Sequence, residues 1–129
     1  MILVDSSVWV DYLKGTLTAQ TEKLDILLAQ EPLAIGDLIL TEVLQGFRQD
    51  DDYQTAKTLL CSLPVHAMLG ATMSLKSAEN FRKLRKQGIT IRKTIDTMIA
   101  TYCIENELPL LHSDKDFQAF QQFFGLRIV

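Results

Sequence analysis

Short apolar runs that alternate with longer stretches of helical periodicity constrain the fold of this chain most strongly. This alternation is typical of a parallel β-sheet whose strands are joined by helices. The runs predict strands at residues 2–4, 33–35, 64–68 and 108–112, with 126–129 as a further edge strand. The sequence therefore predicts an α/β fold with a central parallel sheet of four to five strands flanked by helices.

Helical segments lie between these runs and have recognisable stop residues. Gly15, Pro32 and Gly88 each follow a stretch of helical periodicity. The predicted helices cover 6–13, 18–30, 37–47, 51–63, 71–87, 94–106 and 114–123. Because the 129 residues contain no repeat or linker and suffice to bury a core, we expect one domain over 1–129.

The charge and the apolar runs narrow the class of protein. The net charge of −3 argues against nucleic-acid binding by overall basic charge, although bound cations can link an acidic pocket to phosphate. No apolar run has the length of a membrane span, and the segment 1–5 lacks the features of a signal peptide. We therefore expect a cytoplasmic protein without a membrane partner. Cys61 and Cys103 lack the spacing of metal ligands and are interpreted as reduced thiols.

Acidic residues follow two of the predicted strands. Asp5 comes directly after the run at 2–4, and Asp114 follows the run at 108–112. Ligands of parallel sheets bind outside the carboxyl ends of the strands, so both are candidate site residues. An equally good explanation is that Asp5 or Ser6 is the N-cap of the helix that follows. Asp116 is a weaker candidate, because Ser113 and Asp116 have the spacing of a capping box.

Two further acids border apolar helix faces. Asp96 shares a helical stripe with Ile99 and Cys103, where an unpaired charge is costly to bury. The alternative for Asp96 is a favourable interaction with the helix dipole. Glu42 lies at the edge of the apolar face of its helix, and the alternative is a solvated surface glutamate.

Four carboxylates at one end of a sheet would require a cation. Two unit charges about 5 Å apart repel by roughly 3 kcal/mol at an effective dielectric constant near 20. Oxygen-only ligands suit Mg²⁺ or Mn²⁺ and not zinc, and such a cation can activate water against a phosphodiester. His66 and His112 lie in strand-like runs and are interpreted as structural. The residues thus favour metal-dependent hydrolysis without a covalent nucleophile.

The order of these residues along the chain resembles the PIN-domain nucleases, and among them the VapC-type toxins of bacterial toxin–antitoxin pairs. The resemblance covers nearly the whole chain and is carried by the segments 2–9, 41–47, 96–100 and 110–117. It implies a single PIN-like domain and Mg²⁺- or Mn²⁺-dependent hydrolysis of RNA by a metal-activated water. It assigns catalytic and metal contacts, direct or through water, to Asp5, Glu42, Asp96 and Asp114.

The resemblance also implies supporting residues and partners. It places Ser6, Ser113 and Asp116 beside the metal-binding acids. It implies a homodimer, inhibition by a cognate antitoxin, and an RNA substrate such as tRNA or ribosomal RNA. Many relatives have threonine at the Ser113 position with a basic residue before it, whereas His112 stands there in this chain. That departure concerns substrate contacts and leaves the acids unaffected.

The basic residues leave two interpretations open. Arg92 and Lys93 stand just before Asp96 and are candidates for RNA binding, whereas the cluster at 82–86 is interpreted as the solvated face of a helix. An alternative function is a non-catalytic PIN-fold module that binds RNA or protein. Four mutually repelling acids argue against it, because an idle site has no physical reason to keep them.

Overall fold

Four short parallel strands form the centre of the computed structural model, which describes residues 1–129. They are β1 (Ile2–Val4), β2 (Leu33–Gly36), β3 (Val65–His66) and β4 (Leu110–Leu111), in the order β3-β2-β1-β4. Leu3 of β1 pairs with Ala34 on one side and with Leu110 on the other. All three side chains are buried, as expected for a parallel sheet covered on both faces. The predicted parallel α/β sheet is confirmed.

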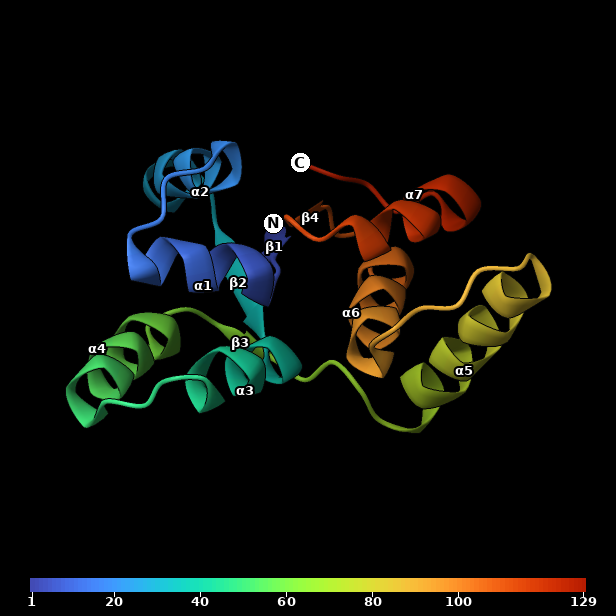
Figure 1. Ribbon diagram of the computed structural model, residues 1–129, viewed down its shortest axis with the longest axis horizontal. Coiled ribbons are helices and arrows are strands. Elements are labelled where there is room, and N and C mark those ends of the chain that lie inside the picture. Colours follow the sequence, from blue (N-terminus) through green and yellow to red (C-terminus); the bar gives the residue numbers. More distant parts are fainter.

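Seven α-helices and one short 3₁₀ helix connect and cover the strands. They are α1 (Ser6–Lys14), α2 (Ala19–Gln30), α3 (Asp37–Gln45), α4 (Asp50–Cys61), α5 (Ala71–Lys86), α6 (Thr94–Glu105), η1 (Lys115–Phe117) and α7 (Gln118–Phe124). The strands run through the middle of Figure 1, with α1 to α4 on one side and α5 to α7 on the other. None of these helices has the length and apolar character needed to cross a membrane.

Local signals explain why the first helices begin and end where they do. The Asp5 side chain accepts a hydrogen bond from the Ser7 N–H at the start of α1, and Gly15 ends that helix in the left-handed conformation (φ 77°). Thr18 and Thr21 form a capping box at the start of α2. The predicted stop at Gly15 is therefore observed, and Asp5 does act as a helix cap.

Several predicted strands are shorter than the apolar runs suggested. The run at 64–68 contributes only Val65 and His66, because the Met68 N–H bonds to the Asp37 side chain instead of continuing the ladder. The run at 108–112 contributes only Leu110 and Leu111. The predicted edge strand at 126–129 reduces to one parallel bridge between Leu110 and Ile128. Polar side chains and turns thus end these strands earlier than hydrophobicity alone indicates.

Candidate metal centre

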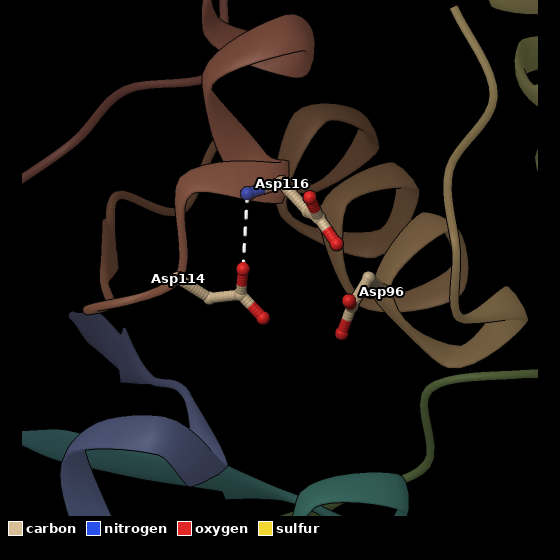
Figure 2. A group of neighbouring side chains, drawn as sticks. All are labelled: Asp96, Asp114 and Asp116. Atoms are coloured by element: carbon tan, nitrogen blue, oxygen red, sulfur yellow. Dashed lines mark hydrogen bonds between the residues drawn. The ribbon is translucent and has the colours of Figure 1, made fainter.

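Three aspartates from two elements form a group at the carboxyl end of the sheet. Asp96 lies in the first turn of α6, Asp114 follows β4, and Asp116 lies in η1. One carboxylate oxygen from each lies within 4.8 Å of the others, and Figure 2 shows the three side chains around a common space. Asp96 is only 2% exposed. The structure therefore brings together two acids that are far apart in sequence, Asp96 and Asp114, with Asp116 as the third.

A local turn positions Asp114 and Asp116. The Asp114 carboxylate accepts a hydrogen bond of 3.0 Å from the Asp116 N–H, and Asp114 is thereby the N-cap of η1. The predicted capping box of Ser113 and Asp116 is wrong, because Asp114 and not Ser113 is the N-cap. The Asp114 N–H donates to Nδ1 of His112 (3.1 Å), whose ring packs against Phe117. The interpretation of His112 as a structural residue fits these contacts.

Asp5 and Glu42 lie outside this group of three but are near enough to affect it. Each is held by a serine: Asp5 Oδ2 accepts hydrogen bonds from the Ser7 N–H and hydroxyl (3.0 and 2.5 Å), and Glu42 Oε1 accepts one from the Ser6 hydroxyl (2.6 Å). The charges of both acids raise the pKa of Asp96. Glu42 is half-buried and its side chain is held by Ser6.

Two carboxyls of the site, those of Asp96 and Asp5, have strongly raised pKa values. Burial raises the pKa of Asp96 from the ordinary 3.8 to about 7; Lys93 opposes that rise, while Asp5 and Asp114 add to it. Burial also raises the pKa of Asp5, against the hydrogen bonds from Ser7 that favour its ionised form. Perturbed carboxyls of this kind are typical of functional sites.

Two carboxylate oxygens of the site are buried without any hydrogen-bond partner. They are Oδ2 of Asp96 and Oδ1 of Asp5. An unsatisfied buried acceptor costs about 1–3 kcal/mol, and more when it is charged, so native proteins rarely leave one without a reason. A bound cation supplies such a reason, and the all-oxygen donor set suits a hard divalent ion and not zinc. The residues present therefore fit a divalent metal.

Lysine and arginine side chains occupy the edge of the acidic group. The Lys93 ammonium lies 3.6 Å from Asp114 and 3.9 Å from Asp96, and the Arg92 guanidinium lies 3.1 Å from Asp116. Burial lowers the pKa of Lys93, but the neighbouring carboxylates outweigh this and raise it. Both cations remain more than half exposed, so they can exchange the carboxylates for another anion.

Ser7 is a site residue that sequence reasoning missed. Its hydroxyl donates to Asp5 and accepts the backbone N–H of Ser113 (3.1 Å), which joins the end of β1 to the loop that carries Asp114. Ser113 takes part through this N–H, and Ser6 through Glu42. The position of Ser7 two residues after Asp5 indicates a local cap, but no sequence pattern reveals its contact with a residue 106 positions away.

The fold and this acidic group agree with comparisons to known proteins. The family model of the PIN domain matches residues 2–122. The chain therefore belongs to the PIN-domain family. Within the family it is similar to the VapC ribonucleases: ribonuclease VapC11 of Mycobacterium tuberculosis and a VapC ribonuclease of Mycobacterium bovis are each 30% identical to it over 129 residues. These alignments cover 98% of this chain and 96% of each relative, and they confirm the predicted resemblance.

Solved structures of other proteins share this fold. VapBC2 of Rickettsia felis, bound to a promoter DNA fragment, contains a chain that matches with a TM-score of 0.78 and 19% identity. That match covers 100% of this chain and 98% of the other. VapC20 of Mycobacterium tuberculosis, described as a Sarcin–Ricin loop cleaving toxin, matches with a TM-score of 0.69 and 18% identity, over 92% and 94% of the two chains. Both matches support the PIN fold of this chain.

Proposed function

We propose that this chain is a divalent-metal-dependent endoribonuclease and the toxin of a toxin–antitoxin pair. The observation that carries the proposal is the group of Asp96, Asp114 and Asp116, with a buried Asp96 oxygen that has no hydrogen-bond partner within the protein. The names of the relatives at 30% identity supply the substrate class, because both are ribonucleases. A cluster of carboxylates without a nucleophilic serine, cysteine or histidine base suits hydrolysis by an activated water.

In this proposal Asp96 and Asp114 hold the metal with Asp116, and Asp5 and Glu42 complete the acidic site. The ion is Mg²⁺ or Mn²⁺, which supplies Lewis-acid stabilisation and an activated water when bound. Ser7 and Ser6 restrict the carboxylates of Asp5 and Glu42 to one orientation each. The oriented carboxylates of Asp5 and Glu42 raise the affinity of the site for a divalent cation. Because they are already held in place, these side chains need little rearrangement when the cation binds.

Arg92 and Lys93 are proposed to bind the RNA phosphates beside the metal. In the structure both pair with the acids that would hold the cation. Neutralisation of these acids by a metal weakens the ion pairs, and the two exposed side chains then have phosphate oxygens as the nearest strong acceptors. In the metal-free protein Arg92 and Lys93 thus partly balance the charge of the acids. In the metal-bound protein they would position the RNA substrate.

The proposed partners rest on different grounds: the antitoxin on the VapBC assemblies among the structural neighbours, the RNA on the names of the relatives, and the homodimer on the resemblance to the VapC-type toxins. They are a cognate antitoxin that inhibits the enzyme, a second copy of this chain in a homodimer, and a structured cellular RNA such as tRNA or ribosomal RNA. The proposed place of action is the cytoplasm, where such RNA is found.

Cleavage of total cellular RNA by the purified protein tests the function. We expect discrete fragments with Mg²⁺ or Mn²⁺ and none with EDTA. Asp96→Asn should reduce the rate by more than about 100-fold, because residues that merely support metal ligands already cost roughly 10- to 100-fold when removed. Asp51→Asn, which changes an exposed acid of α4, is the matched control and should cut normally.

Calorimetry of metal binding distinguishes a wrongly assigned site from a protein that binds metal but does not cut RNA. Cleavage that persists in Asp96→Asn, or in EDTA, would contradict the proposed site. If folded protein binds metal through Asp96 but cuts no RNA, the chain is instead the binding module considered as the alternative function.

A further inference from the structure

Basic residues are concentrated in one short part of this acidic protein. Six of its 13 lysines and arginines lie between residues 82 and 93, and no aspartate or glutamate occurs from 80 to 95. The six are Arg82, Lys83, Arg85 and Lys86 at the end of α5, and Arg92 and Lys93 before α6. A chain with a net charge of −3 therefore presents a local surface of strongly positive potential.

The four basic residues at the end of α5 have no acidic partner in the structure, whereas Lys76 earlier in the helix pairs with Glu105. The ion pairs of this region belong to Arg92 and Lys93, whereas Arg82, Lys83, Arg85 and Lys86 are exposed and lie beyond 4.0 Å of any carboxylate. Arg85 packs over the Phe81 ring at 5.7 Å. Arg82 and Lys86 are like charges four positions apart on the helix and repel each other slightly, and an anionic partner would relieve that repulsion.

Two cavities with aromatic and basic lining flank this end of α5. One of about 320 Å³ lies between α5 and the start of α6, with Phe81, Arg82 and Thr94 in its wall. The other, of about 270 Å³, lies between α5 and α7 and is lined by Lys83, Lys86 and Phe123, among others. The Phe123 side chain is 42% exposed although it is large and apolar. Aromatic rings beside cations are the recurring elements of surfaces that bind single-stranded nucleic acid.

These cavities lie on elements that lead directly into the acidic site. Thr94 follows Lys93, whose ammonium contacts Asp96 and Asp114. Phe123 is in α7, which continues from η1 and its Asp116. Figure 1 shows α5, α6 and α7 together on the same side of the sheet. Lys93 and η1 therefore connect this basic and partly aromatic surface to the acidic group along the chain.

We propose that Arg82, Lys83, Lys86 and Phe123 form a binding surface for an extended, single-stranded part of the RNA substrate outside the cleavage site. The cations bind phosphates, and the Phe123 ring stacks on a base. The identity of the polyanion rests on the proposed ribonuclease function. Charge complementarity and the aromatic lining favour RNA over an acidic protein segment, which has no bases to stack.

Salt dependence of RNA binding tests the role of the cations. The probe is a fluorescein-labelled single-stranded RNA of about 20 nucleotides, titrated in an Asp96→Asn background that prevents cleavage. The triple variant Arg82→Ala, Lys83→Ala, Lys86→Ala should lower the slope of log K against log salt by about 2, since each single-strand phosphate contact contributes about 0.7. The matched control is Lys14→Ala, Arg48→Ala, Lys57→Ala, which removes the same charges from exposed positions elsewhere and should leave the slope unchanged.

Conservative and non-conservative changes at Phe123 test the stacking contact. Phe123→Leu keeps an apolar side chain but removes the ring, and should weaken RNA binding by about fivefold or more. Phe123→Tyr keeps the ring and should bind as the unaltered protein does. Urea unfolding of each variant shows whether a loss of binding reflects a loss of folded protein.

The outcomes separate this surface from the catalytic proposal. Unchanged salt slope and affinity in the triple variant, with metal-dependent cleavage in the unaltered protein, would overturn the surface and leave the function standing. Altered dimer or antitoxin binding in Phe123→Leu, with RNA binding intact, would likewise overturn it and assign the face to a protein. RNA binding that depends on these residues in a protein that never cuts RNA would support the surface and contradict the nuclease.

Discussion

The Ser7 hydroxyl connects two parts of the acidic site that belong to different strands. It donates to Oδ2 of Asp5 after β1 and accepts the Ser113 N–H after β4. The Asp5 carboxylate has a second oxygen that is buried without a partner, so its orientation depends on the hydrogen bonds to the first. We infer that Ser7 is a positioning residue, which acts on the site through Asp5 and the loop before Asp114.

Replacement of Ser7 by alanine should therefore lower both activity and stability. We expect a decrease in kcat of roughly 10-fold or more, as for other residues that support metal ligands. The free energy of unfolding should fall by about 1–3 kcal/mol, because the buried Asp5 carboxylate loses a donor. RNA cleavage and urea unfolding measure the two effects.

The conservative variant and a control make the test of Ser7 specific. Ser7→Thr keeps the hydroxyl and should recover part of the activity. Ser62→Ala removes an exposed hydroxyl bonded only to a nearby backbone carbonyl and should change neither quantity. A Ser7→Ala protein that is less stable but has the kcat of the unaltered protein would show that Ser7 is structural only.

At the scale of the elements, the junction of β2 and α3 places Glu42 near the site. Gly36 is both the last residue of β2 and the N-cap of α3, so the strand enters the helix without a loop. A Cβ atom at Gly36 would lie 1.9 Å from the sulfur of Met68 and 2.7 Å from its Cγ. Met68 is fully buried and its N–H is bonded to Asp37. The close approach of these two segments therefore requires glycine at position 36.

Gly36→Ala should reduce the free energy of unfolding by about 1–3 kcal/mol through overpacking against Met68. Met68→Ala alone should cost about 2–5 kcal/mol because it leaves a cavity. The double variant should lose less unfolding free energy than the two single variants together, since the methyl group added at position 36 partly fills the cavity left by the Met68 side chain. Urea unfolding of the four proteins measures this coupling.

Gly46→Ala is the control for the effect of a methyl group alone. A Cβ atom at Gly46 would lie 3.5 Å from its nearest neighbour, the Val43 carbonyl oxygen, which is an ordinary van der Waals contact. The backbone of Gly46 has a right-handed helical conformation that alanine readily adopts. This variant should be at least as stable as the unaltered protein, because alanine restricts the unfolded chain. Additive losses in the Gly36 and Met68 cycle would show that the two positions are not in close contact.

At the scale of the whole molecule, the acidic site links folding to pH and to metal. Folding holds the pKa of Asp96 near 7, well above its ordinary 3.8, because burial disfavours the charged form. The stability gained from the protonated form is fully present below about 3.8 and is lost as the pH rises through 7. The loss for this one group is on the order of 4 kcal/mol at most.

The metal-free protein should therefore unfold at a lower urea concentration at pH 8 than at pH 6. Asp96→Asn removes one of the two buried carboxyls whose pKa is raised and should reduce this dependence, and it should be more stable than the unaltered protein at pH 8. Mg²⁺ or Mn²⁺ should raise the melting temperature of the unaltered protein at pH 8 but not of Asp96→Asn. Equal pH dependence in the two proteins would contradict the assignment of the raised pKa to Asp96.

Much of the fold could be predicted from the sequence, because its signals are local. The apolar runs at 2–4 and 33–35 predicted buried parallel strands, and Gly15 predicted the end of α1. The sequence indicates Asp96 as a site residue because a charge beside Ile99 and Cys103 is unusual, and the structure buries it. These inferences depend on residues within about one helical turn or one strand of each other, which the chain order already brings close.

Contacts between distant segments were decided by the tertiary structure alone. Asp116 had a local explanation as a capping residue, but packing of η1 near α6 makes it the third acid of the group. The bond from Ser113 to Ser7 spans 106 positions, and that from Ser6 to Glu42 spans 36. Sequence periodicity predicts on which face of its own helix or strand a side chain lies. Only the packing of one element on another determines which faces meet, and therefore which carboxylates share a site.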